Sequence, residues 1–109
     1  MLTLPIKKKW FDMIRSGEKK EEYREITPYY MTRFENIGLI HLFMPTDAKA
    51  DIILRNGYSK NAPFIKVIVR LFMREGKPEW GAEPNKTYYV LQILKVYDFT
   101  QYIKDGDGK

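Results

Sequence analysis

Two long apolar stretches in the second half of the chain constrain its fold more than any other feature. Residues 64–74 are rich in Ile, Val and Phe and end at a Glu-Gly-Lys-Pro segment. Residues 86–97 contain a similar run of Tyr, Val, Ile and Leu. Because β-branched and aromatic residues at this density favour strands, we expect two long strands here. A purely helical fold is therefore excluded.

The first half of the chain combines helical patterns with shorter strand-like ones. Residues 5–17 carry apolar side chains at helical spacing, with Pro5 suited to the first helical position and Gly17 to the residue after the last. A second helix is expected over residues 28–35, with Thr27 as its N-cap. Shorter strands are expected over residues 20–25, 38–44 and 51–55.

The segment 38–44 is apolar on both faces, so we expect it to be a central strand. It contains His41, the only histidine, for which a hydrogen-bonded structural role is favoured over a catalytic one. Two early helices followed by long strands indicate an α+β domain rather than alternating βαβ units. The expected architecture is a small mixed β-barrel of about five strands with flanking helices.

Residues 17–24 read Gly-Glu-Lys-Lys-Glu-Glu-Tyr-Arg and form the most informative motif. In a strand, Glu22 and Arg24 face the same side, where a core-facing strand would carry apolar residues. Such a strand is either a solvated edge of the sheet or the wall of a polar cleft. The spacing alone favours the edge, because charged edge strands are common.

The pattern Gly-x-Lys-x-x-Glu-x-Arg, formed by Gly17, Lys19, Glu22 and Arg24, resembles the signature of the ASCH (ASC-1 homology) domain of the PUA-like superfamily. The loop at Trp80 and the strand after it also resemble the end of many ASCH domains. This resemblance implies a PUA-like barrel whose motif residues line a cleft that receives RNA or a nucleoside. It places the ASCH-like domain at residues 1–103, followed by a tail at 104–109 that we expect to be disordered.

The three charged motif residues are the first candidates for ligand binding. Lys19 can reach an anionic group or, once desolvated, act as a base. Arg24 offers a planar fork for a phosphate or a base edge, and Glu22 can accept a proton from an exocyclic amine. The competing interpretation is an ion-pair network on the barrel wall, worth about 0–1 kcal/mol for each exposed pair.

Aromatic residues supply the remaining candidates for the binding site. Tyr58, Trp80 and Tyr89 are expected to contact the ligand, because a base stacked on such a ring gains about 1–3 kcal/mol. Strand alternation implies that only one of Tyr88 and Tyr89 faces the cleft, and the pattern does not distinguish them. For Trp80, an equally weighted alternative is that the ring anchors its loop to the barrel.

The net charge of +5 and the 15% content of aromatic residues suit an anionic partner, which we expect to be RNA, a nucleoside or a nucleotide. The chain has no cysteine, which excludes disulfides and thiolate chemistry. We expect no metal, since one histidine and no cysteine leave only carboxylates as ligands. No cofactor is implied. Without a signal peptide or an apolar run of membrane-spanning length, we expect a cytoplasmic protein with no membrane partner.

Three functions remain open: binding of RNA or a nucleoside, hydrolysis, and contact with another protein. Some ASCH proteins remove the acetyl group from N4-acetylcytidine with a Lys, a Thr and a Glu. By this resemblance Lys19 would be catalytic. Glu22 occupies the position of the nucleophilic Thr, so in an enzyme it would activate water by a different mechanism. We expect Lys19→Ala and Arg24→Ala to weaken ligand binding and leave folding largely intact.

Overall fold

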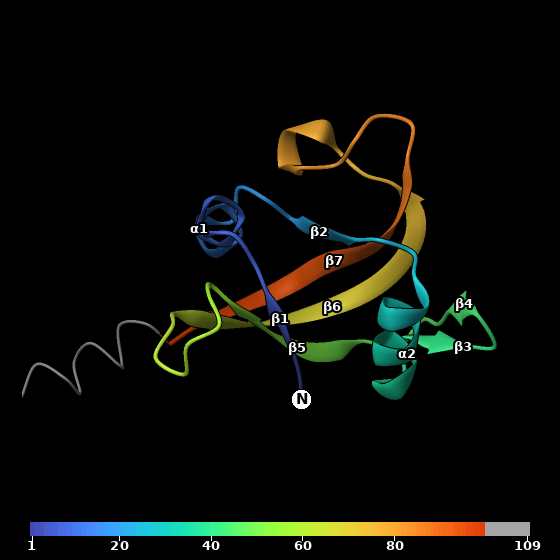
Figure 1. The fold of residues 1–109 in the computed structure, drawn as a ribbon, viewed down its shortest axis with the longest axis horizontal. Helices are drawn as coiled ribbons and strands as arrows, with labels where there is room; N and C mark the ends of the chain where they lie inside the picture. The colour runs from blue at the N-terminus through green and yellow to red at the C-terminus, as the bar shows by residue number, and fades with distance from the viewer. Residues whose placement is uncertain (100–109) are drawn as a thin grey trace, which may run out of the picture.

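The computed structural model describes residues 1–99 and contains a curled five-stranded sheet with two helices (Figure 1). The end of the domain expected at residue 103 and the tail expected at 104–109 lie outside these residues. The strand order is β1-β5-β6-β7-β2, with β1 parallel to β5 and all other neighbours antiparallel. The strands are β1 (Leu2–Pro5), β5 (Ala50–Arg55), β6 (Phe64–Glu75), β7 (Thr87–Asp98) and β2 (Glu21–Arg24).

The expected α+β class is confirmed, and the main sheet has five strands, but they are not the five that the sequence predicted, because β1 was not expected and residues 38–44 do not belong to this sheet. The two long strands, β6 and β7, are 12 residues each and pair along most of their length, with a register shift after Ile68. Because β1 and β2 are the two ends of the strand order, the curled sheet is a half-barrel rather than a closed one.

The first helix, α1 (Lys8–Ser16), begins later than the sequence predicts, because Pro5 is the last residue of β1. The expectation missed β1, whose pairing with β5 joins residues about fifty positions apart and leaves no local signal. Gly17 ends α1 as expected, with a φ of 88° in the left-handed region that favours glycine. The second helix, α2 (Pro28–Asn36), has the predicted cap: the Thr27 hydroxyl accepts a hydrogen bond from the Tyr30 amide.

The prediction of a central strand over residues 38–44 is wrong. This segment contributes to a separate hairpin of β3 (Ile40–His41) and β4 (Met44–Pro45), and β6 takes the central place in the main sheet. The hairpin loop is Leu42-Phe43, with φ values of 49° and 67°. Both loop side chains are exposed, and so is His41, which therefore has no buried structural role. The apolar run is interrupted by a chain reversal that hydrophobicity does not reveal.

Both helices pack on one face of the sheet. Alternate residues of β6, namely Ile65, Val67, Val69 and Leu71, are buried there with residues of both helices in the main core. A smaller cluster lies on the opposite face, where Ala82, Tyr88 and Val90 pack with Tyr23 and Phe72. The loop that covers it contains the short 3-10 helix η1 (Pro78–Trp80).

Gly76 allows the loop to approach this smaller cluster closely. A Cβ at Gly76 would lie 2.5 Å from a ring carbon of Tyr23 and 2.7 Å from the Ala82 methyl.

Within residues 1–99, neither helix is long and apolar enough to cross a membrane.

Candidate functional site

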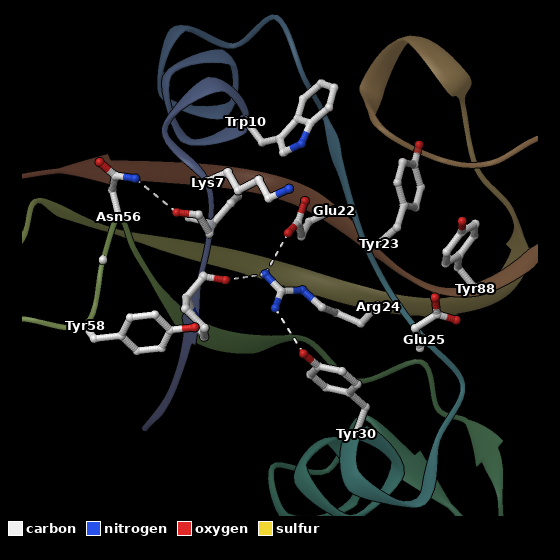
Figure 2. Close-up of a pocket in the computed structure, with 13 residues that line it drawn as sticks. Lys7, Trp10, Glu22, Tyr23, Arg24, Glu25, Tyr30, Asn56, Tyr58 and Tyr88 are labelled. Carbon is white, nitrogen blue, oxygen red and sulfur yellow. Dashed lines mark hydrogen bonds and ion pairs between the residues drawn. The ribbon is translucent and has the colours of Figure 1, made fainter.

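A pocket of about 640 Å³ lies between β1, the start of α1, β2, α2 and the loop after β5 (Figure 2). The sequence left open whether the charged strand β2 is an edge of the sheet or the wall of a polar cleft. In the structure β2 is the last strand of the sheet and also forms a wall of this pocket, so it is both. The lining residues are Pro5, Ile6, Lys7, Trp10, Glu22, Tyr23, Arg24, Glu25, Tyr30, Asn56, Gly57, Tyr58 and Tyr88.

Glu22 and Arg24 form an ion pair on the pocket wall. They lie opposite Leu91 and Tyr89 of β7, which are core residues, so both point to the inner side of the sheet. The Arg24 Nη2 donates to the Glu22 Oε2 at 2.7 Å, and both side chains are largely buried. The sheet geometry therefore directs two charged groups inward at its edge.

Two further contacts hold the Arg24 guanidinium in place. Its Nη2 donates to the Pro5 carbonyl at 2.7 Å, and its Nη1 donates to the Tyr30 hydroxyl at 3.2 Å. These bonds tie β2 to β1 and to α2, as the dashed lines in Figure 2 show. Burial acts to lower the pKa of Arg24, but the Glu22 charge and the Tyr30 hydroxyl outweigh it and raise that pKa. Arg24 is thus a fixed cation with a defined orientation.

Lys19 lies behind this pair and does not line the pocket. Its side chain is 1% exposed, donates to the Trp80 carbonyl and lies 3.3 Å from the Glu22 Oε1. Its ammonium also lies over the Trp10 and Tyr23 rings, at 4.9 and 4.8 Å from their centroids. Burial lowers the pKa of Lys19, against the opposing effect of the Glu22 charge. This burial argues against the expectation that Lys19→Ala would leave folding intact.

Trp80 contributes its backbone, not its ring, to this arrangement. Its carbonyl accepts the Lys19 hydrogen bond, its ring packs with the Lys77 ammonium at 4.6 Å, and it does not line the pocket. The tryptophan in the pocket wall is Trp10, which the sequence presented only as an apolar residue of α1. A Cβ at Gly81 would lie 3.0 Å from the Trp10 ring, so the η1 loop packs directly against it.

The two adjacent tyrosines of β7 face opposite sides of the sheet. Tyr89 is 2% exposed and packs edge-on against Phe34 in the core, with ring centroids 5.5 Å apart. It is therefore not in contact with the pocket. Tyr88 lines the pocket, and its hydroxyl accepts a hydrogen bond from the Glu83 amide at 3.0 Å.

Tyr58 lies at the mouth of the pocket and is 90% exposed. Its loop is tied to the N-terminal segment, because the Asn56 side chain donates to the Ile6 carbonyl at 3.1 Å. Sequence reasoning missed two other lining tyrosines, Tyr23 and Tyr30. Tyr23 was visible as the one uncharged residue of the charged segment 20–25, whereas nothing in the sequence distinguished Tyr30.

The charges that line the pocket are balanced. Lys7 and Arg24 contribute two positive charges, and Glu22 and Glu25 contribute two negative ones. Figure 2 shows the Lys7 side chain directed into the pocket below Trp10. Glu25 is also paired with Lys86 at 2.7 Å. The pocket thus offers fixed donors and acceptors between aromatic walls without a strong net charge.

Within the described part of the chain, no group of three or more His, Cys, Asp or Glu side chains is arranged to hold a metal ion. Comparisons with protein-family models, with curated proteins and with solved structures find no match to this chain.

Proposed function

We propose that the pocket binds the base of a nucleoside or of an RNA nucleotide. The observation that carries this proposal is the Glu22–Arg24 pair, held in one orientation on the wall of a pocket with aromatic sides. A neutral base with a donor and an acceptor on one edge complements a carboxylate beside a guanidinium. A free phosphate group would instead meet the Glu22 charge.

The size and composition of the pocket support the same proposal. A volume of about 640 Å³ lies within the roughly 300–1,000 Å³ that is typical of small-molecule sites. The aromatic walls offer faces on which a base can stack, and Tyr58 adds an exposed ring at the mouth. The net charge of +5 favours approach of a polyanion such as RNA.

Isothermal titration with a panel of nucleosides, nucleotides and short RNAs tests this proposal. Tyr58→Ala removes a stacking face, so we expect it to lower the affinity about 5- to 150-fold. Phe43→Ala is the matched control, because Phe43 is also an exposed aromatic residue but does not line the pocket. Equal losses in both variants, or no binding by the parent protein, would contradict the proposal.

Glu22→Gln distinguishes a base from a phosphate at the Glu22–Arg24 pair. This variant keeps the shape of the side chain and removes its charge. If the amino group of a base donates to Glu22, the variant weakens binding, because a charged acceptor is lost. If a phosphate occupies this position, binding is retained or improves.

The enzyme alternative is tested with the same variant. Lys19 is held by the Trp80 carbonyl and Glu22 and does not line the pocket, so of the two catalytic candidates Lys19 and Glu22 only the Glu22 carboxylate lies in the pocket wall. Acetate release from N4-acetylcytidine by the parent, lost in Glu22→Gln, would establish a hydrolase. Turnover that persists in this variant would exclude Glu22 as the acid–base group.

A further inference from the structure

Aromatic and basic side chains gather on the face of the sheet opposite the main core. Along β6, Lys66 and Ile68 alternate with the buried residues Ile65, Val67 and Val69, so they point outward. The β6–β7 register places Tyr97 opposite Lys66 and Lys95 opposite Ile68. Arg55 of β5 lies opposite Phe64 and faces the same side. We call this surface the outer sheet face; its members are Arg55, Phe64, Lys66, Ile68, Lys95, Tyr97 and Phe99.

Three aromatic rings of the outer sheet face form a continuous string. The Tyr97 and Phe99 rings are nearly parallel, with an interplanar angle of 9° and centroids 6.5 Å apart. Phe64 lies beside them, 6.3 Å from Phe99 between centroids. All three side chains are partly exposed. Rings with partly exposed faces at the surface of a sheet are platforms on which successive bases can stack.

The cations of this face lie next to the same rings. The Lys66 and Lys95 ammonium groups are 4.7 and 5.0 Å from the Tyr97 ring centroid, and the Arg55 guanidinium is 5.8 Å from that of Phe64. Cation–π contacts at exposed sites are weak, and base stacking contributes more. A base can therefore displace a lysine from the ring, and the released ammonium can pair with a phosphate.

The outer sheet face carries more positive than negative charge. The Lys66 ammonium lies 3.8 Å from the Asp51 carboxylate, which partly neutralises the positive charge of this face. Among residues 1–99, Lys95 and Arg55 have no carboxylate within ion-pair distance. Two cations without a carboxylate partner beside partly exposed rings favour an anionic partner with aromatic groups over a neutral apolar one.

We propose that the outer sheet face binds single-stranded RNA, with bases stacked on Tyr97, Phe99 and Phe64 and with Lys66, Lys95 and Arg55 near the phosphates. The face shares no residue with the pocket around Glu22 and Arg24, so this second site does not depend on the pocket. It reads no defined base sequence, because every base has a π-face.

Fluorescence anisotropy with a labelled oligouridine of about eight nucleotides, a length within the usual single-strand site sizes, tests this site on the full chain. Tyr97→Leu keeps apolar bulk but removes the stacking face, so we expect the affinity to fall about 5- to 150-fold. Lys95→Glu should weaken binding. It should also reduce the slope of log affinity against log salt concentration by about 0.7 for each phosphate that the protein no longer neutralises.

Lys8→Glu is the matched control for charge. Lys8 lies on the exposed side of α1, pairs with Asp12 and lines neither surface, so its reversal changes the net charge equally without touching the proposed contacts. Nucleoside binding in the pocket should be unchanged in Tyr97→Leu and Lys95→Glu. That result separates this proposal from the proposed function of the pocket.

Three outcomes would overturn the proposal. Lys95→Glu and Lys8→Glu could weaken oligouridine binding equally, which would indicate attraction by net charge alone. A saturating nucleoside could displace the oligonucleotide completely, which would place the strand only in the pocket. Binding to anionic lipid vesicles that depends on Lys95, without binding to oligouridine, would identify a membrane surface as the partner.

Discussion

At the scale of single residues, the buried charges of the motif organise the site. Glu22 lies between two cations: Lys19 approaches one of its oxygens at 3.3 Å and Arg24 the other at 2.7 Å. Lys19 secures the η1 loop through the Trp80 carbonyl, and Arg24 joins β2 to β1 through the Pro5 carbonyl. The same network that stabilises the fold therefore orients the polar groups of the pocket.

Removal of the Lys19 side chain should destabilise the fold. Lys19→Ala leaves a cavity beside Trp10 and deprives Glu22 of one partner, so we expect a loss of roughly 3 kcal/mol in the free energy of unfolding. Lys19→Met retains the packing of the alkyl chain, so its free energy of unfolding should fall by less than that of Lys19→Ala. Chemical denaturation measures both variants. A loss below about 1 kcal/mol in Lys19→Ala, the size expected for an exposed ion pair, would contradict this role.

The same residue should make stability depend on pH. Burial lowers the pKa of Lys19 from its ordinary value of 10.5, so the unfolded chain binds more protons between the folded-state pKa and 10.5. The contribution of Lys19 to stability therefore rises with pH through this window and is lost as the pH falls through the folded-state pKa.

We expect the free energy of unfolding of the parent, relative to Lys19→Met, to increase as the pH rises toward 10.5, the ordinary pKa of a lysine. The comparison with Lys19→Met cancels the titration of other groups, including Tyr23, whose pKa is raised by burial. Denaturation curves of both proteins across this range give the difference. A constant or decreasing difference would show that burial does not disfavour the charged form of Lys19.

At the scale of elements, the β3–β4 hairpin holds two of the three non-glycine residues with positive φ in the described chain. Its two-residue loop has positive φ at both Leu42 and Phe43, a conformation in which hairpins prefer Asn-Gly. These two side chains are 73% and 68% exposed, so burial does not compensate for the backbone conformation.

Replacement of Leu42-Phe43 by Asn-Gly should stabilise the protein. We expect a gain of about 1 kcal/mol, which would raise the melting temperature by roughly 4–8 °C for a domain of this size. The double variant Leu42→Ala/Phe43→Ala is the control, because it removes the apolar side chains but keeps non-glycine residues at positive φ. A lower melting temperature in the Asn-Gly variant would indicate that the two side chains stabilise the fold.

At the scale of the whole molecule, sequence reasoning succeeded where the signal was local. The density of β-branched residues located β6 and β7, and Thr27 and Gly17 marked helix ends that the structure contains. It failed for β1, which depends on a distant partner strand, and for residues 38–44, where a chain reversal interrupts an apolar run.

The candidate site shows the same division between local and distant information. The two-residue spacing of Glu22 and Arg24 predicted that they share one side of a strand, and they form an ion pair. The sequence did not indicate that Lys19 is buried, that Tyr89 belongs to the core, or that Trp10 lines the pocket. These facts depend on how α1 and the η1 loop pack across the sheet, which no local pattern contains.

Chemical-shift mapping of the ¹⁵N-labelled protein, during titration with nucleosides and short RNAs at two salt concentrations, tests directly whether the pocket binds a base. Binding in the pocket should shift the backbone amides of residues 22–25, Tyr30 and residues 56–58, which surround it, and leave the β3–β4 hairpin unaffected. Nucleoside-induced shifts at the pocket should persist at the higher salt concentration, because the pocket carries no strong net charge. If neither nucleosides nor RNAs shift these amides, the pocket does not bind a nucleobase, which contradicts the proposed function.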